Sequence, residues 1–550
     1  MKKSVLIAAI LTVGIIAVNA QNAGSSLANI DQFILNQLQL QKKPGLATVI
    51  IKDDSIVWSG NYGYAILADS LEVTDTTLFN AFSIGKSLTA ACVLQLWEDG
   101  LLGMDQDINS FLPFQIDNPH VANDSISARM LMSHTSSIID YNFYNHVIVG
   151  DPTELLGSFL ANYLSPGGSY YNSGNFRTFP PGSGYVYSNF GSALNGYLVE
   201  PLTGQLFKDC VRNNLLNPLE MYRSAWYLNE LNINNLAIGY DYVGGNYQPN
   251  PHYGMAAYPG VSLRSNVIEL ANYLTMIMNG GSFKGVQVLN PATIDSMMTL
   301  QPNAVNYGLG LQKTTTLNYY NTIQRITWGH AGGGESGYAG YIRFCPADNT
   351  GVVLLSNSSS YPIMILRRLF DYAAMIVIAE PASEITKSDF KANWQPAPDA
   401  SHYFLDVSLD DNFNVFLNGY ENFNVGYDTC FIIAGLNQNT DYYYRLRAVN
   451  VHDTGAYSNP VHAQTLLGTE IDQLSKEKVK VWFDGQTLYI DIADTPEAIA
   501  TFYSITGQRL NKVQLKKGLN GINPDFSDQA FIVNIAGNQL HFSKKIIKVK

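Results

Sequence analysis

The feature that most constrains the fold of this chain is a change in hydrophobic periodicity near residue 380. Upstream, apolar residues recur with helical spacing over 90–100 and 267–278, whereas 47–51 and 351–355 are short continuous apolar runs typical of buried strands. Downstream, short alternating segments are separated by turn residues, which predicts strands alone. We therefore expect an α+β domain over residues 25–380, followed by two all-β sandwich domains over 381–466 and 470–550.

Residues 1–20 have the pattern of a secretory signal peptide. Lys2 and Lys3 precede an apolar run that ends in Val18-Asn19-Ala20, a small-x-small sequence of the kind that signal peptidase cleaves. The run is short for a bilayer span, and an uncleaved membrane anchor is the alternative. No later stretch is apolar enough to span a membrane, so we expect a secreted or cell-surface protein without an integral membrane segment after signal removal.

Composition removes several classes of function. The net charge of −12 is opposite in sign to the basic surface that nucleic-acid binding needs. The four cysteines, Cys92, Cys210, Cys345 and Cys430, are far apart and form no C-x-x-C pair, so we expect buried free thiols. The chain contains no H-E-x-x-H, H-x-H-x-D, P-loop or G-x-S-x-G sequence. Neither a metal nor a cofactor is therefore expected.

Ser83-Ile84-Gly85-Lys86 is the first candidate for chemistry. The S-x-x-K pattern also begins at Ser388 and Ser475, but only at Ser83 does it follow an apolar strand-like segment and open a helix. Spacing i, i+3 places the Ser83 hydroxyl and the Lys86 amine on one face of that helix. A serine needs a neighbouring base to become a nucleophile, and a buried lysine can serve because desolvation lowers its pKa. An ordinary helix cap with a solvated lysine is the alternative.

Two further short patterns complete a possible site. In Tyr187-Ser188-Asn189, residues i and i+2 of an extended segment face the same side, so the tyrosine can relay protons while the amide holds the substrate or the lysine. In His330-Ala331-Gly332-Gly333, a strand would place His330 and Gly332 on one face, with Gly332 letting a substrate backbone lie close. The N–H groups of Gly333 and Ser83 would then form an oxyanion hole. Each pattern alone is equally compatible with a simple turn.

In this order, the patterns resemble the serine hydrolases of the class C β-lactamase and DD-peptidase superfamily. The segment 82–90 is similar to the family's first motif, and the segment 131–137 resembles L-L-S-H-T-S-G. The segment 181–191 matches P-G-x-x-x-x-Y-S-N-x-G, and the segment 328–333 resembles the third motif. The resemblance covers about residues 30–378. It implies an α/β/α sandwich, in which helices flank an antiparallel sheet, with a helical lobe and a site between the two lobes.

The resemblance also implies roles for individual residues. Ser83 would be the nucleophile, Lys86 and Tyr187 the acid/base pair, and Asn189 the substrate binder, with the choice of base between Lys86 and Tyr187 left open. His330 stands where β-lactamases of this type usually carry lysine, and a histidine is only partly charged at neutral pH. Relatives with histidine there are often esterases, DD-peptidases or D-amino-acid peptidases.

We therefore expect an acyl-enzyme hydrolase acting on an ester or amide, including D-amino-acid or cell-wall peptides. β-Lactam hydrolysis and a non-catalytic surface adhesion protein on the same fold are the alternatives. His134 is expected to be structural, and Ser137, which replaces the usual glycine of the second motif, is expected to alter a local turn.

The two downstream domains have their own resemblances. Residues 381–466 are similar to a fibronectin type III domain, with Trp394 in the core and Leu436 and Tyr442 in a tyrosine corner. A spacer role is expected, with carbohydrate or protein binding as the alternative. Residues 470–550 resemble the C-terminal sorting domain of the type IX secretion system, through Ala500 to Gln508 and the terminal lysines, which implies that secretion machinery as a partner. A plain adhesive β-sandwich is the alternative there.

Overall fold

The computed structural model describes residues 29–122, 125–320, 324–467, 479–483, 487–504, 509–523, 530–537 and 540–547. The expected signal peptide lies outside the described residues. No helix among the residues described has both the length and the apolar character needed to cross a membrane.

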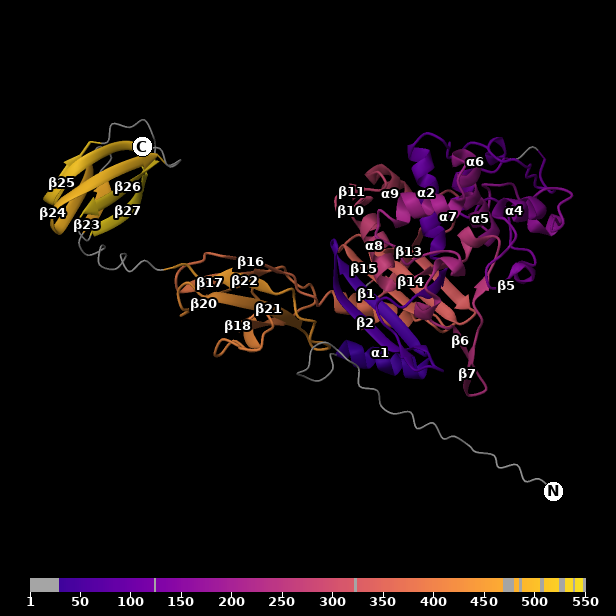
Figure 1. The fold of residues 1–550 in the computed structure, drawn as a ribbon, viewed down its shortest axis with the longest axis horizontal. Helices are drawn as coiled ribbons and strands as arrows, with labels where there is room; N and C mark the ends of the chain where they lie inside the picture. Colours follow the sequence, from indigo (N-terminus) through magenta and orange to yellow (C-terminus); the bar gives the residue numbers. More distant parts are fainter. Residues whose placement is uncertain are drawn as a thin grey trace, which may run out of the picture.

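A seven-stranded antiparallel sheet forms the centre of the first domain (Figure 1). Its spatial order is β12 (Gln312–Leu317), β13 (Gln324–Glu335), β14 (Tyr338–Cys345), β15 (Thr350–Ser356), β1 (Gly45–Lys52), β2 (Ser55–Ile66) and β3 (Leu71–Glu72). The first strand pairs with the last in sequence, with Ala47 opposite Leu355 and Val49 opposite Val353. Both strands are buried along almost their whole length, which explains why their sequences are continuous apolar runs.

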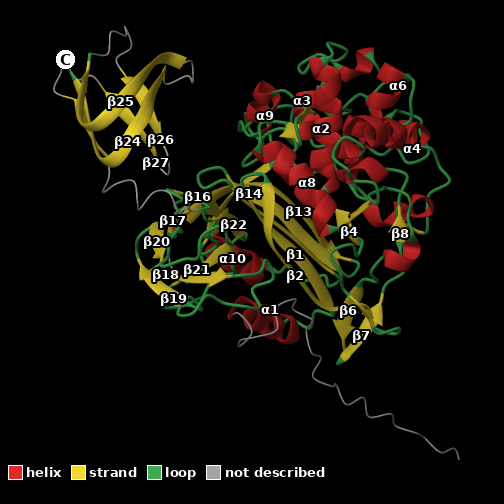
Figure 2. Cartoon of the chain, turned by 60° about the vertical axis from the view of Figure 1, so that its left-hand side comes forward, coloured by secondary structure: helices red, strands yellow, loops and turns green. Residues whose placement is uncertain are grey.

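Helices cover both faces of this sheet, as Figures 1 and 2 show. On one face, α1 (Asn29–Leu40) and α10 (Ile363–Ala373) pack on Leu46 and Ile50 of β1. On the other face, α8 (Val267–Met278) packs on Val49 and Val353. The sheet is thus the middle layer of an α/β/α arrangement, as expected.

The remaining helices form a lobe on the α8 side. They are α2 (Gly85–Glu98), α3 (Ala128–Met132), α4 (Leu156–Leu164), α5 (Asn189–Tyr197), α6 (Val199–Thr203), α7 (Phe207–Val211) and α9 (Pro291–Met297). Short turns η1 to η7 connect them, of which η2 (Phe143–His146) and η7 (Tyr258–Gly260) border the site. Four small strand pairs complete this domain: β4 (Phe79–Phe82) with β9 (Leu263–Ser265), β5 (Ile148–Val149) with β8 (Tyr253–Gly254), β6 (Tyr240–Val243) with β7 (Asn246–Pro249), and β10 (Ser282–Phe283) with β11 (Val286–Gln287).

Residues 379–464 form two antiparallel sheets. One contains β16 (Ala379–Ser383), β17 (Asp389–Trp394) and β20 (Cys430–Ala434); the other contains β19 (Phe423–Gly426), β18 (His402–Ser408), β21 (Asp441–Val449) and β22 (Val461–Gln464). Trp394 and Tyr442 are buried between them, and the Asn437 N–H donates to the Tyr442 hydroxyl at 3.0 Å. The sheets contact the first domain through an ion pair between Arg368 of α10 and Asp453.

The last described residues form one antiparallel sheet. It contains β23 (Val479–Phe483), β24 (Leu488–Ser504), β26 (Ala530–Gly537) and β27 (Leu540–Ile547) in that order, with β25 (Arg509–Ile522) also paired to β24. The Gly507-Gln508 pair of the proposed sorting motif lies outside the described residues. The domain boundaries and the type IX resemblance stay predictions.

The cysteines agree with the sequence prediction in all but one detail. All four are free, and Cys92, Cys210 and Cys345 are buried. Cys430, at the start of β20, is only half-buried because that strand belongs to a three-stranded sheet with one exposed face.

Candidate active site

Ser83 lies in a tight turn between β4 and α2. The prediction that Ser83 opens the helix is wrong by two residues, because α2 begins at Gly85. The preceding residue, Phe82, has a φ of +45°, a left-handed conformation that costs a non-glycine residue about 1–3 kcal/mol. The Asn80 side chain stabilises it by accepting the Phe82 N–H at 3.0 Å. The strained turn places the Ser83 hydroxyl at the border of a cavity.

Lys86, in the first turn of α2, is 4% exposed and has three acceptors around its amine. Its Nζ donates to the Ser83 Oγ at 2.8 Å, to the Asn189 Oδ1 at 2.7 Å and to the Gly260 carbonyl at 2.6 Å. Burial lowers the pKa of Lys86 to about 7, against the opposing charge of Asp140. A large fraction of this amine is therefore neutral near pH 7 and able to accept the serine proton.

Tyr187 lies on the other side of Ser83. The Ser83 hydroxyl is near enough to the Tyr187 phenol to act on its pKa, and the Lys86 Nζ is 4.8 Å from the Tyr187 ring centroid. Burial raises the pKa of Tyr187 well above its ordinary value, and Tyr307 adds to this effect. Tyr187 is therefore a protonated phenol near pH 7, suited to donating a proton.

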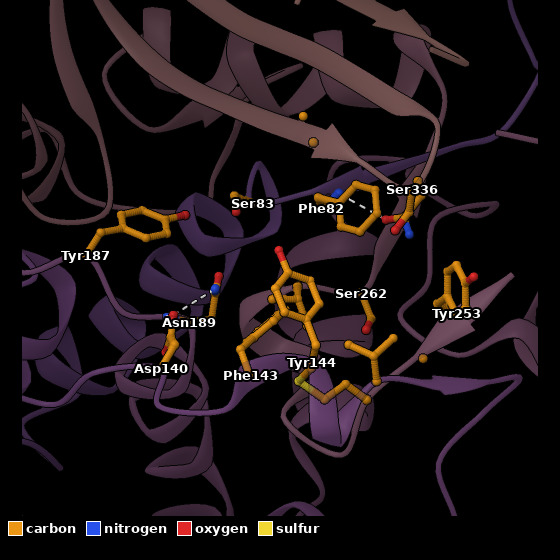
Figure 3. Close-up of a pocket in the computed structure, with 17 residues that line it drawn as sticks. Phe82, Ser83, Asp140, Phe143, Tyr144, Tyr187, Asn189, Tyr253, Ser262 and Ser336 are labelled. Carbon is orange, nitrogen blue, oxygen red and sulfur yellow. Dashed lines mark hydrogen bonds between the residues drawn. The ribbon is translucent and has the colours of Figure 1, made fainter. Parts of the chain in front are cut away.

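Asn189 is held by Asp140, a residue that the sequence reasoning missed. The two Asp140 oxygens accept the Asn189 N–H at 2.8 Å, the Asn189 Nδ2 at 2.8 Å, the Phe190 N–H at 3.0 Å and the Ser188 Oγ at 3.1 Å. Figure 3 shows Asp140 beside Asn189. These hydrogen bonds orient the Asn189 amide so that its Oδ1 faces Lys86. The sequence predicts that the Asn189 amide holds either the substrate or Lys86, and the structure shows the contact with Lys86. Asp140 lies three residues after the end of the second motif, but nothing in the sequence marks it as a partner of α5.

His330 is buried behind the site instead of bordering it. It is 3% exposed and lies with Lys86 and His134 around a small internal cavity. Burial, and then the charge of Lys86, lower the pKa of His330 to about 3. The prediction that this histidine is partly charged at neutral pH is wrong, because the charges acting on it come from the cations Lys86 and Arg343, and no carboxylate offsets its burial.

The glycines of the third motif have a different role from the one predicted for Gly332. In β13, a Cβ at Gly332 would lie 2.0 Å from the Ala81 carbonyl oxygen, so this glycine permits the close approach of β13 to β4. It is the neighbouring Gly333, with a φ of +97°, that borders the cavity together with Ser83. Ser83 and Gly333 thus line the same cavity, and the oxyanion hole formed by their N–H groups stays a prediction.

The residues expected to be structural lie behind the catalytic set. His134 is buried, its Nδ1 accepts the Ser188 N–H at 3.2 Å, and its ring centroid is 4.3 Å from that of Tyr187. Ser137 keeps a φ of +64°, the left-handed conformation that the usual glycine would adopt without strain.

The cavity at Ser83 has a volume of about 690 Å³. Figure 3 shows Ser83, Tyr187 and Asn189 on one side, Tyr253 on the opposite side, and Phe143 and Tyr144 between them. Among the residues that line it, none is a lysine or an arginine, and Asp140 is the one carboxylate. The lining is therefore mainly aromatic, apolar and hydroxyl-bearing.

Comparisons with known proteins place this site in a family. Protein flp of Staphylococcus aureus (strain MRSA252) is 23% identical over 337 residues, which is 61% of this chain and 64% of that protein. The chain thus spans less than two thirds of that relative's length. The Putative D-alanyl-D-alanine carboxypeptidase of Escherichia coli (strain K12) is 24% identical over 385 residues, covering 61% of this chain and 83% of that protein.

Two solved structures are also similar. The octameric penicillin-binding protein homologue from Pyrococcus abyssi has a TM-score of 0.49 and 19% identity, covering 94% of this chain and 99% of its own. A class C beta-lactamase has a TM-score of 0.49 and 18% identity, covering 62% of this chain and 95% of its own. The family model described as Beta-lactamase matches residues 30–371. Since that match includes the whole Ser83 site and more than half of the chain, the chain belongs to the beta-lactamase family.

Proposed function

We propose that this chain is a serine hydrolase that forms an acyl-enzyme on Ser83 and acts on uncharged carboxylic esters. The observation that carries the proposal is that the Lys86 amine is hydrogen-bonded to the Ser83 Oγ at 2.8 Å, with the Tyr187 phenol beside the same hydroxyl in the cavity. A nucleophile in contact with both a base and an acid is the arrangement that acyl transfer requires.

The pKa shifts favour Lys86 as the base and Tyr187 as the acid. The neutral Lys86 amine takes the Ser83 proton while Oγ forms a bond to the ester carbonyl carbon. The C–O bond to the alcohol then breaks, and the leaving oxygen takes its proton from Tyr187, which Lys86 reprotonates. Water hydrolyses the acyl-enzyme by the same groups in reverse, releasing the carboxylic acid and restoring Ser83.

The charge of the cavity favours a neutral substrate. β-Lactams and peptides with a free C-terminus carry a carboxylate, which needs a cation to offset its desolvation. No lysine or arginine is among the residues that line this cavity, and His330 is neutral and buried behind it. The side chains of Phe143, Val147 and Val261 offer an apolar surface to an acyl group instead.

One comparison of substrates tests the reaction and the substrate class together. We expect p-nitrophenyl acetate to be hydrolysed with a kcat/KM at least about a hundredfold above that for nitrocefin or a D-Ala-D-Ala peptide, because an unpaired buried carboxylate costs several kcal/mol. Faster turnover of either carboxylate substrate would overturn the neutral-ester assignment. Absence of all three activities would favour the adhesion protein.

A matched pair of serine variants tests the nucleophile. Ser83→Ala should abolish turnover and covalent labelling by a fluorophosphonate probe, whereas Ser388→Ala, at another S-x-x-K sequence, should leave both unchanged. Labelling that persists in Ser83→Ala would show that the nucleophile is elsewhere.

For the remainder of the chain, we propose export and a spacer role. The N-terminal pattern of residues 1–20 supports export to the cell surface or medium, and the similarity of 470–550 to sorting domains supports the type IX route. The buried Trp394 and the hydrogen bond from Asn437 to Tyr442 support a fibronectin type III assignment for 381–466. Retention of a C-terminally truncated chain in the periplasm would test the sorting proposal.

A further inference from the structure

A second cavity of about 680 Å³ lies on the other side of η2 from Ser83. Within this short turn, Phe143 and Tyr144 line the first cavity, while Asn145 and His146 line the second. The second cavity is also lined by α4 and by the segment 169–172. It is nearly as large as the first, and the proposed acyl transfer does not use it.

Two polar side chains in this cavity have unused hydrogen-bonding capacity. The His146 ring packs edge-on against Phe159 and Tyr170, with centroids 5.1 and 4.9 Å apart, and its nitrogens form no hydrogen bond to any residue that the structure describes. Burial lowers the pKa of His146, so its ring is neutral and offers one donor and one acceptor. The Glu154 oxygens have only long contacts, at 3.4 Å to the Asn162 Nδ2 and 3.4 Å to the Tyr170 hydroxyl.

The other lining side chains indicate the chemistry of a ligand. Amide and hydroxyl groups that both donate and accept are contributed by Asn142, Asn145, Thr153, Ser169 and Asn172. No lysine or arginine is among the residues that line the cavity, so an anion would find no countercharge. An ammonium ion would pair with Glu154 but would leave the amide N–H groups without acceptors. Neutral hydroxyl groups match the whole set.

Aromatic rings complete the match. Tyr141 and Tyr170 line the cavity and remain 42% and 38% exposed, so part of each side chain is available for contact. The C–H face of a pyranose ring is flat and apolar, and an aromatic ring buries it at little entropic cost. A ligand with many hydroxyl groups and one apolar face is a sugar.

We propose that this second cavity binds a sugar unit of a neutral glycan, with Glu154 and His146 bonded to its hydroxyl groups and Tyr170 against its apolar face. The site is distinct from Ser83 and does not depend on ester hydrolysis. It would hold the protein on a polysaccharide beside the catalytic cavity.

The test uses the full chain carrying Ser83→Ala, so that no turnover interferes with binding. Cellotriose, chitotriose, mannotriose and xylotriose are titrated by calorimetry, with tetramethylammonium as the cationic probe. We expect at least one trisaccharide to bind and tetramethylammonium not to bind. Tyr170→Ala should weaken binding about tenfold and Glu154→Gln about fivefold, the sizes expected for one aromatic contact and one charge-assisted hydrogen bond.

Tyr222→Ala is the matched control, because Tyr222 is 68% exposed and lines neither cavity. It should leave the affinity unchanged, and circular dichroism should show all three variants folded. Absence of binding by every trisaccharide, binding that is equal in the Ser83→Ala parent and in the parent carrying Tyr170→Ala or Glu154→Gln, or binding of tetramethylammonium alone would each overturn the proposal. If the wild-type chain has no esterase activity while the sugar binding is observed, only the hydrolase function is contradicted.

Discussion

Two buried cations, Lys86 and Arg368, are surrounded in opposite ways. Lys86 is bonded to a hydroxyl, an amide oxygen and a carbonyl, all uncharged, and it adjoins the Ser83 cavity. Arg368 of α10 is fully buried, pairs with the carboxylate of Asp453 on the loop after β21, and has the Tyr320 ring 4.8 Å from its guanidinium carbon. The Lys86 amine has three acceptors but no countercharge in direct contact, whereas Arg368 has the Asp453 carboxylate at Nη2, while its Nε and Nη1 have no hydrogen-bond partner among the described residues.

The difference explains why one cation suits chemistry and the other suits architecture. Neutral acceptors do not repay the desolvation of an ammonium ion, so burial lowers the pKa of Lys86 to about 7 and makes it a base. An arginine does not deprotonate, and its ion pair fixes α10 against the following sheets. Four predictions test this contrast, from the largest expected effect to the smallest.

Removing the Lys86 amine should have the largest effect. Lys86→Met fills a similar volume but leaves Ser83 without a base, and kcat/KM for p-nitrophenyl acetate should fall by about 10³, within the range for loss of a general base. Lys43→Met is the control: Lys43 is also 4% exposed with a pKa lowered by burial to about 7, but it bonds Ser360 and lines no described cavity. An equal loss of activity in both variants would contradict the assignment of the base.

Breaking the ion pair between Arg368 and Asp453 should lower the stability of the protein without changing its activity. Arg368→Met leaves the buried Asp453 carboxylate unpaired, which should cost about 3–5 kcal/mol in the free energy of unfolding, measured with urea. Activity of the folded protein should not change. Arg368→Met combined with Asp453→Leu should recover most of the loss, and a double variant no more stable than the single one would contradict this account.

Asp140→Asn should lower kcat/KM and move the pH midpoint of the activity. In the wild type, kcat/KM should rise with pH through a midpoint near the Lys86 pKa of about 7, because only the neutral amine accepts the proton. Loss of the carboxylate that orients Asn189 should lower kcat/KM by about tenfold or more. Because the charge of Asp140 raises the pKa of Lys86, the midpoint should also move to lower pH. An unshifted midpoint would make Asp140 merely structural.

Replacing His330 should have the smallest effect. His330→Asn exchanges one uncharged side chain for another, so kcat/KM should change by no more than about threefold, and the pH midpoint should stay where it is. A new dependence on pH between 5 and 8 would instead show that the histidine carries a functional charge, contrary to its buried position.

The sequence by itself determined the secondary structure that carries the site and most of its residues. The apolar runs at 47–51 and 351–355 became β1 and β15, and the predicted helix at 267–278 became α8 with the same bounds. Ser83, Lys86, Tyr187 and Asn189 came together as their motifs indicated. The strands and the helix are local features, because periodicity depends on neighbouring residues alone, whereas the meeting of the motifs was implied by the family resemblance.

Tertiary structure alone decided the partners and charges of these residues. Asp140 and Gly260 bond the catalytic set from segments far away in the chain, and no local pattern marks them. The pKa values of Lys86 and His330 depend on how completely the lobes exclude water from them, which the fold sets. The second cavity exists only because η2, α4 and the segment 169–172 meet in space, with the Glu154 oxygens facing inward from the segment before α4.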